Sequence, residues 1–128
     1  MKKTKSQQRC EKITNKKGVG IHLIAEFWHG KVSEDKKEIE KILLEAAKKA
    51  KSTPLKFAFH KFQPHGFSGV LLVAESHISL HFWPELDYLA IDIFTCGANT
   101  DPFKALEYLK KKFKPKKAVI KSVNRGES

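Results

Sequence analysis

The chain has 128 residues and a formal net charge of +11, from 25 lysines and arginines and 14 aspartates and glutamates. This length suits a single domain, and no apolar stretch approaches the roughly 18 residues that a membrane-spanning helix needs. The basic N-terminus also lacks the apolar run of a signal peptide. Because Cys10 and Cys96 are the only cysteines, we expect free thiols, a cytoplasmic location and no membrane partner.

The positive charge is concentrated at the two ends of the chain. Residues 1–17 carry a net charge of +6 and residues 110–128 carry +7, whereas residues 18–109 carry −2. A nucleic-acid surface would interleave lysine and arginine with aromatic residues on one face, and the body of the chain does not. We therefore expect no specific nucleic-acid partner, a disordered basic tail over residues 1–17 and one domain over residues 18–126.

The first two predicted elements follow different periods. Apolar residues at every second position over residues 19–28 predict a strand. Ser33 is the expected N-cap of a helix that ends before Thr53 and Pro54. The apolar stripe of this helix, expected to face the core, consists of Ile39, Ile42, Leu43, Ala46, Ala47 and Ala50.

The middle of the chain predicts strands joined by short turns. Period-two patterns favour strands over residues 55–59 and 77–82, and an apolar run within residues 67–74 favours another strand there. Residues 63–66 are typical of a turn. In the strand over residues 77–82, one face carries Ile78, Leu80 and Phe82, and the other carries His77, Ser79 and His81.

The last third begins with a turn at residues 84–87 and a strand over residues 89–93. Asp101 and Pro102 predict the start of a helix, whose expected inner stripe is Phe103, Leu106, Leu109 and Phe113. Residues 116–123 favour a final edge strand. The resulting order is β-α-β-β-β-β-α-β, and the short turns imply antiparallel pairing. We predict an α+β fold, a two-layer α/β sandwich with a mainly antiparallel sheet and two helices on one face.

Residues 75–81, followed by Trp83, Pro84 and Glu85, resemble the processing site of the small prokaryotic S-adenosylmethionine decarboxylases. Three further blocks, at residues 59–62, 66–70 and 91–97, match this pyruvoyl-dependent family in the same order. The likeness extends over residues 18–126.

This resemblance implies a proenzyme that cleaves itself between Glu75 and Ser76. The Ser76 hydroxyl would attack the Glu75 carbonyl to form an ester, and elimination and hydrolysis would leave a pyruvoyl group in place of Ser76. That group is the expected covalent cofactor, which would form a Schiff base with the substrate and accept the electrons as CO₂ leaves. The implied reaction is the decarboxylation of S-adenosylmethionine for spermidine synthesis.

The resemblance also implies roles for individual side chains. His81 would be the base of processing, Ser68 would assist the acyl shift, and Cys96 would return a proton to the substrate carbon. These roles are chemically reasonable, because an imidazole titrates near neutrality and an ordinary thiol, with a pKa of about 8.5, is protonated at pH 7.

Substrate binding and assembly follow from the same resemblance. Phe62 and Trp83 are implied as plates for adenine and Glu85 as the acceptor for the ribose hydroxyls. The habit of the family implies a homodimer of cleaved protomers.

Simpler interpretations remain open for several residues. Phe62 and Cys96 could belong to the core, and Glu85 could be an ordinary turn residue. His60 and His77 match the family motif, but we assign neither a role and interpret them as structural. The sequence has no CxxC or HExxH pattern, so we expect no metal site.

Two alternatives to S-adenosylmethionine decarboxylation remain open from the sequence. Phe82 and residues 86–88 depart from the usual family pattern beside the proposed ligand residues, so arginine or ornithine is the alternative substrate. A processing-dead binding subunit is the third hypothesis, and the intact Ser76, His81 and Cys96 argue against it.

Overall fold

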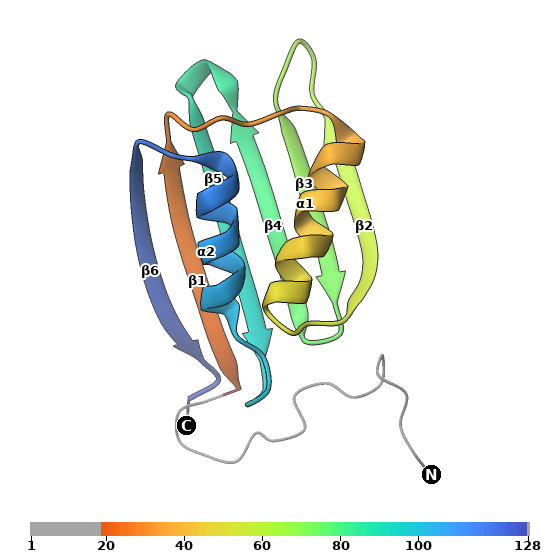
Figure 1. Cartoon of the computed structure of the whole chain (residues 1–128), viewed down its shortest axis with the longest axis vertical. Coiled ribbons are helices and arrows are strands. Elements are labelled where there is room, and N and C mark those ends of the chain that lie inside the picture. Colours follow the sequence, from red (N-terminus) through yellow and green to blue (C-terminus); the bar gives the residue numbers. More distant parts are fainter. Residues whose placement is uncertain (1–18, 128) are drawn as a thin grey trace.

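The computed structural model of the chain describes residues 19–127, so the tail predicted over residues 1–17 lies outside the described residues. In chain order the elements are β1 (Gly20–Trp28), α1 (Lys36–Lys49), β2 (Pro54–Lys61), β3 (Phe67–Val73), β4 (Ser76–Trp83), the 3-10 helix η1 (Pro84–Leu86), β5 (Tyr88–Cys96), α2 (Pro102–Phe113) and β6 (Lys117–Arg125) (Figure 1). This order of strands and α-helices confirms the prediction, with η1 lying within the expected turn at residues 84–87.

The six strands form one sheet in the order β2-β3-β4-β5-β1-β6, with every neighbouring pair antiparallel. Strands β2 to β5 follow one another directly because short turns can join only antiparallel neighbours. The register sets Ser68 of β3 opposite His81 of β4, and Ser76 of β4 opposite Thr95 of β5. Strand β4 therefore lies inside the sheet with residues of the predicted site along its whole length.

Each helix begins at a short polar side chain that accepts hydrogen bonds from backbone N–H groups of the first turn. Asp35, not the predicted Ser33, is the N-cap of α1, and its carboxylate accepts from the backbone N–H of Glu38 at 3.0 Å. The hydroxyl of Ser33 instead accepts from the N–H of Asp35 at 3.1 Å, which orders the turn before the helix. Helix α2 begins as predicted, with Asp101 as its N-cap.

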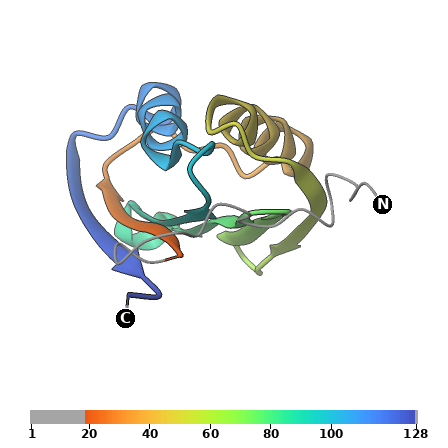
Figure 2. The same cartoon turned by 90° about the horizontal axis from the view of Figure 1, so that it is seen from below.

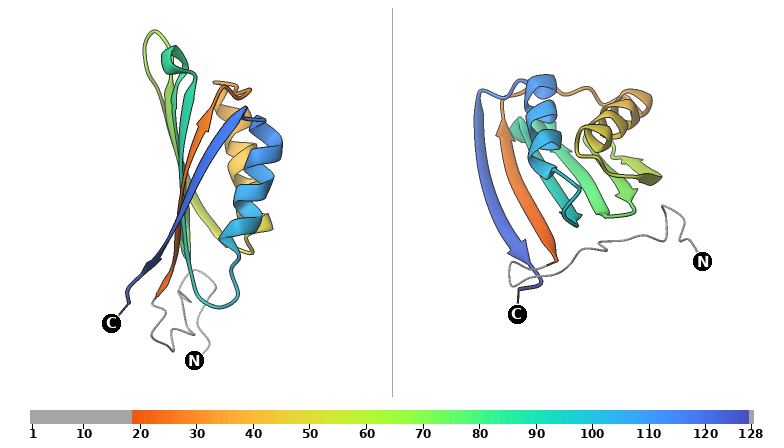
Figure 3. Two further views of the ribbon diagram at one scale, coloured as in Figure 1. Left: turned by 90° about the vertical axis from the view of Figure 1, so that its left-hand side faces the viewer. Right: turned by 60° about the horizontal axis from the view of Figure 1, so that its bottom comes forward.

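Both helices pack on the same face of the sheet and against each other (Figures 2 and 3). Every residue of the predicted inner stripe of α1 is buried. In α2, Leu106, Leu109 and Phe113 are buried as predicted, but Phe103 is 49% exposed, so that part of the prediction is wrong. At 3.6 residues per turn Phe103 lies about 100° round the helix from the buried Pro102. Ala105 faces the core on this turn instead.

The other face of the sheet carries no helix in the described part of the chain, as the edge-on view in Figure 3 shows. The two-layer α+β sandwich with both helices on one face is thus confirmed. Neither α1 nor α2 is long and apolar enough to cross a membrane. The uncovered face carries the side chains at odd positions of β4, among them His77, His81 and Trp83, because alternate residues of a strand point to opposite faces.

Candidate active site

The bond between Glu75 and Ser76 lies where β3 turns into β4, at the lower end of the sheet in Figure 1. Ser76 has a backbone φ of 151°, a positive value that residues other than glycine rarely adopt. Such conformations cost free energy and persist where the surrounding structure enforces them. The backbone is therefore strained at the bond that the sequence identifies as the cleavage site.

Contacts from two other elements fix Glu75. Its carboxylate accepts from the backbone N–H of Thr53 at 2.8 Å and from the Thr53 hydroxyl at 3.2 Å. The Sγ of Cys96, at the end of β5, lies 3.0 Å from the carbonyl oxygen of Glu75. Thr95, opposite Ser76, has a buried hydroxyl without a hydrogen-bond partner among the described residues. The side chain of Glu75 is thus held from the loop before β2, and its carbonyl oxygen contacts the end of β5.

The state of Cys96 differs from the sequence-based expectation. Cys96 is 3% exposed and disulfide-bonded, and the described residues include no free cysteine. The prediction of a free thiol is therefore wrong for Cys96 in this state of the chain, and Cys10 lies outside the described residues. A role as proton donor requires that the bond be reduced, because only the thiol carries a proton.

The side chain of His77, which the sequence suggests is structural, lies next to the hydroxyl of Ser76. The Nδ1 of His77 is 3.3 Å from the Oγ of Ser76. Burial lowers the pKa of His77 below 6.5, and the neighbouring His22 lowers it further, so the ring is neutral at pH 7. The sequence signal for this contact was the position of His77 directly after Ser76 in the family motif.

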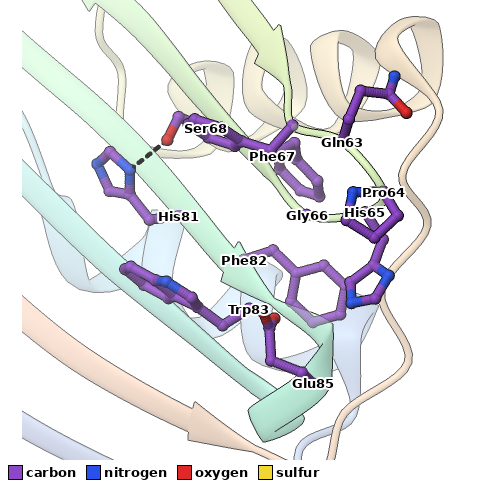
Figure 4. A pocket seen from close by; sticks show the side chains of 11 residues that line it. Gln63, Pro64, His65, Gly66, Phe67, Ser68, His81, Phe82, Trp83 and Glu85 are labelled. Atoms are coloured by element: carbon purple, nitrogen blue, oxygen red, sulfur yellow. Dashed lines mark hydrogen bonds between the residues drawn. The ribbon is translucent and has the colours of Figure 1, made fainter.

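The opposite end of β4 opens into a cavity of about 270 Å³ (Figure 4). Its walls come from the loop between β2 and β3, the start of β3 and the end of β4 with η1. The lining residues are Phe62, Gln63, Pro64, His65, Gly66, Phe67, Ser68, His81, Phe82, Trp83 and Glu85. Gly66 has a φ of 98°, and its N–H donates to the Glu34 carboxylate at 2.6 Å, which anchors the loop. The predicted Phe62, Trp83 and Glu85 therefore share one cavity.

Ser68 and His81 also lie on this cavity, on adjacent strands. The Oγ of Ser68 is 2.7 Å from the Nδ1 of His81, a hydrogen bond that Figure 4 marks with a dashed line. Their pairing follows from the register, which sets the two residues directly opposite each other. This contact joins the two residues that the resemblance assigned to processing.

Aromatic rings continue from the cavity across the uncovered face. Trp83 stacks on Tyr88 with ring centroids 5.5 Å apart, and Tyr88 stacks on Trp28 at 4.5 Å. The Tyr88 hydroxyl donates to the Glu26 carboxylate at 2.6 Å. Burial and this carboxylate raise the pKa of Tyr88 to about 12. Trp83 is thus in contact with Tyr88 on this face, although it is 42% exposed.

The predicted site residues thus form two groups in one chain. Glu75, Ser76 and Cys96 lie at one end of the sheet, and the cavity residues lie at the other. Ser76 and His81 are five residues apart on β4, or about 17 Å at 3.4 Å per residue. A single chain therefore does not bring His81 to the bond that it was predicted to process. Among residues 19–127, no group of three or more His, Cys, Asp or Glu side chains is arranged to hold a metal ion.

Comparison with known proteins agrees with the motif and the fold. A sequence model of the S-adenosylmethionine decarboxylase family matches residues 21–126. The chain is 42% identical over 110 residues to a protein from Clostridium kluyveri named S-adenosylmethionine decarboxylase proenzyme, covering 84% of this chain and 87% of that protein. A proenzyme of the same name from Thermotoga petrophila is 43% identical over 112 residues, covering 86% of both chains.

A solved structure shows the same likeness. The crystal structure of the adenosylmethionine decarboxylase from Aquifex aeolicus superposes with a TM-score of 0.77 at 33% sequence identity. The match covers 87% of this chain and 93% of that one.

Proposed function

The chain belongs to the S-adenosylmethionine decarboxylase family, and on this premise we propose that it makes its own pyruvoyl group from Ser76. Proenzymes of this family carry a pyruvoyl group made from a serine, and the activity is that of a pyruvoyl-dependent carboxy-lyase. The product, decarboxylated S-adenosylmethionine, supplies aminopropyl groups for spermidine synthesis. We also propose a cytoplasmic location, where a polar nucleoside substrate is made and used.

The observation that carries the assignment of Ser76 is the strained junction itself. A φ of 151° at Ser76 is relieved when the peptide bond before it is broken. Attack of Oγ on the Glu75 carbonyl forms an ester, and removal of the α-proton of Ser76 then expels the Glu75 carboxylate. This expulsion breaks the last bond between residues 75 and 76 and separates the chain into residues 1–75 and 76–128. Hydrolysis of the resulting dehydroalanine then releases ammonia and leaves the pyruvoyl group. The ketone so formed supplies an electron sink for the carbanion left when CO₂ departs.

The cavity supports S-adenosylmethionine as the substrate in preference to a basic amino acid. Phe62 and Trp83 expose aromatic faces on which adenine can stack and which also attract a sulfonium cation. Glu85 on the same cavity can accept hydrogen bonds from two ribose hydroxyls. Arginine and ornithine offer neither an adenine nor a diol.

Released CO₂ from carboxyl-labelled substrates tests this choice. The cleaved protein, kept under a thiol reductant so that Cys96 can donate a proton, should release label from S-adenosylmethionine and from neither arginine nor ornithine. Methylthioadenosine keeps the adenine and the diol, so it should inhibit competitively. Release from arginine or ornithine without such inhibition would favour the alternative substrate class.

We also propose a homodimer in which each protomer completes the other's site. Its support is the separation of about 17 Å between Ser76 and His81, together with the uncovered face of the sheet. That face exposes several apolar side chains, including Leu72, Trp83, Val119 and Val123. Packing two such faces about a twofold axis would bury them and could carry the cavity of one protomer to the Ser76 of its partner.

Mixed dimers test the shared site directly. A Ser76→Ala chain and a His81→Ala chain are co-expressed with different tags, and each is also expressed alone. In the mixture the His81→Ala chain should be cleaved, because its intact Ser76 meets an intact His81 from the partner. If no mixed dimer is cleaved although both chains co-purify, the site is contained within one protomer.

A further inference from the structure

The surroundings of His77 differ from those expected of a merely structural histidine. Its Nδ1 lies 3.3 Å from the Ser76 Oγ, and no other imidazole is that close to this hydroxyl in the described part of the chain. In the tautomer of neutral His77 that carries its proton on Nε2, the Nδ1 can accept a hydrogen bond from the Ser76 hydroxyl. In this tautomer the nitrogen that faces Ser76 can take up a proton.

The charged neighbours of His77 come from three other strands. His22 on β1 lies edge-on to it with ring centroids 6.2 Å apart, and the Nε2 of His22 is 2.8 Å from the Asp92 carboxylate on β5. Arg125 on β6 donates to the Nδ1 of His22 at 3.3 Å. These contacts connect the surroundings of His77, through His22, to a carboxylate on β5 and a guanidinium on β6.

Two apolar residues also lie beside His77. Leu72 on β3 and Phe94 on β5 stand opposite it in the sheet. Burial lowers the pKa of His77 most strongly, followed by the effect of His22; Asp92 raises it and Arg125 lowers it. The net direction is downward, so the neutral ring is present at and below the pH at which a free imidazole titrates.

We propose that His77 is a catalytic residue of self-cleavage, the base that takes the proton of the Ser76 hydroxyl as its oxygen attacks the Glu75 carbonyl. This inference rests on the proposed function, in which Ser76 is the processed serine. The bond from Oγ to the carbonyl carbon forms, and the peptide C–N bond breaks. The proton moves from Oγ to the His77 Nδ1 and then to the Ser76 nitrogen, which leaves as an amine. The acyl shift needs no further reactant.

His81 cannot take this part within the same protomer. Its Nδ1 is engaged with Ser68 at 2.7 Å, about 17 Å along β4 from Ser76. Two successive proton transfers then use two imidazoles: His77 serves the acyl shift from within the chain, and His81 serves the later removal of the α-proton. This division predicts that the two histidine variants stop at different intermediates.

The test compares His77→Asn with a matched substitution elsewhere. Asparagine keeps a hydrogen-bond acceptor near the place of Nδ1 but cannot take up a proton. His29→Asn is the control, because His29 is exposed and its φ of 59° suits asparagine. Freshly synthesised precursors are incubated from about pH 5 to pH 8, and cleavage is followed by intact mass.

The wild-type rate should fall as His77 is protonated on the acid side of a free imidazole's pKa. His77→Asn should cleave about 100-fold more slowly or worse, which is the usual contribution of a general base. It should also lose this pH dependence, and added imidazole should restore part of its rate. His29→Asn should keep both the wild-type rate and the wild-type pH profile.

Hydroxylamine distinguishes the steps, because it cuts esters far faster than amides. His81→Ala should accumulate the ester and be cut between residues 75 and 76, whereas His77→Asn should not be cut. His77→Gln is measured in the same way. The cleavage result is taken from the His77 variant whose unfolding temperature equals that of Ser76→Ala, an uncleaved chain, so that a folding defect is not mistaken for a loss of the base. Cleavage at the wild-type rate, or accumulation of ester in the His77 variant, would overturn the role of His77. Cleavage of Ser76→Ala at the same bond would instead overturn the proposed function.

Discussion

The two ends of β4 differ in ways that suit them to different tasks. At the Ser76 end the backbone is strained, Cys96 is buried and the Glu75 carboxylate is held by Thr53. At the Trp83 end the side chains are exposed and surround an open cavity. A strained, enclosed bond favours a single reaction of the chain with itself, whereas exposed aromatic and acidic groups favour repeated binding of a ligand.

The two ends of β4 are too far apart to form one site within a single chain. Ser76 and Trp83 are seven residues apart on one strand, or about 24 Å at 3.4 Å per residue. The proposed pyruvoyl group at one end and the proposed adenine-stacking Trp83 at the other are too far apart to act on one substrate molecule within a protomer. Turnover would therefore need a dimer that brings the two ends of different protomers together.

The largest effect is expected from Ser76→Ala, which removes the attacking hydroxyl. No cleavage and no decarboxylation should remain, since neither the ester nor the ketone can form. Intact-mass analysis should show one full-length chain even after long incubation with a reductant, while wild-type protein splits after Glu75. Two fragments from the variant would mean that the reacting end of β4 has been wrongly identified.

A change at the other end should leave cleavage intact and weaken binding. Trp83→Leu removes a stacking face, and aromatic stacking on a base contributes about 1–3 kcal/mol. The KM for S-adenosylmethionine should therefore rise by about 5- to 150-fold, with self-cleavage at the wild-type rate. Leu86→Ala, an exposed apolar change on η1 outside the cavity lining, is the control and should alter neither quantity.

Much of the fold was predictable because periodicity and turn residues are local signals. The order of strands and helices and the buried stripe of α1 followed from them. Ser33 was wrongly predicted as the N-cap because Asp35, two residues later, competes for the same role and accepts from the first turn of α1. The burial of Phe103 was wrongly predicted because the helix has 3.6 residues per turn. Residues chosen three apart therefore move gradually away from the buried face.

The site was predictable as a set of residues but not as an arrangement. Ser76 and His81 lie close together in the sequence motif. Because the segment is an extended strand, however, the two residues are about 17 Å apart in space. The contact of Glu75 with Thr53, and the network from His77 to Arg125, join strands that are distant in sequence. Such contacts depend on the register of the whole sheet, which no local pattern specifies.

A smaller effect is expected from Glu85→Gln, which keeps the size of the side chain and removes its charge. Hydrogen bonds to a charged acceptor contribute about 1 kcal/mol more than neutral ones, so kcat/KM for S-adenosylmethionine should fall by about fivefold to tenfold. Methylthioadenosine should bind more weakly by the same factor, as measured by competition. Unchanged affinity for this nucleoside would show that Glu85 does not contact the ribose.

The smallest effect on activity is expected from Tyr88→Phe, which keeps the stacked ring under Trp83 and removes the hydroxyl that donates to Glu26 at 2.6 Å. Cleavage and KM should stay near wild type, while the free energy of unfolding should fall by about 1 kcal/mol at neutral pH.

The pKa of Tyr88 is raised from 10.0 to about 12 by burial and by Glu26. In the folded state the phenol thus keeps its proton at pH values where the unfolded chain has lost it. Its stabilising contribution is complete below about pH 10 and disappears as the pH rises towards 12. Thermal unfolding of both proteins across this range should show the stability difference shrinking with rising pH; a constant difference would mean that the hydroxyl does not titrate against Glu26.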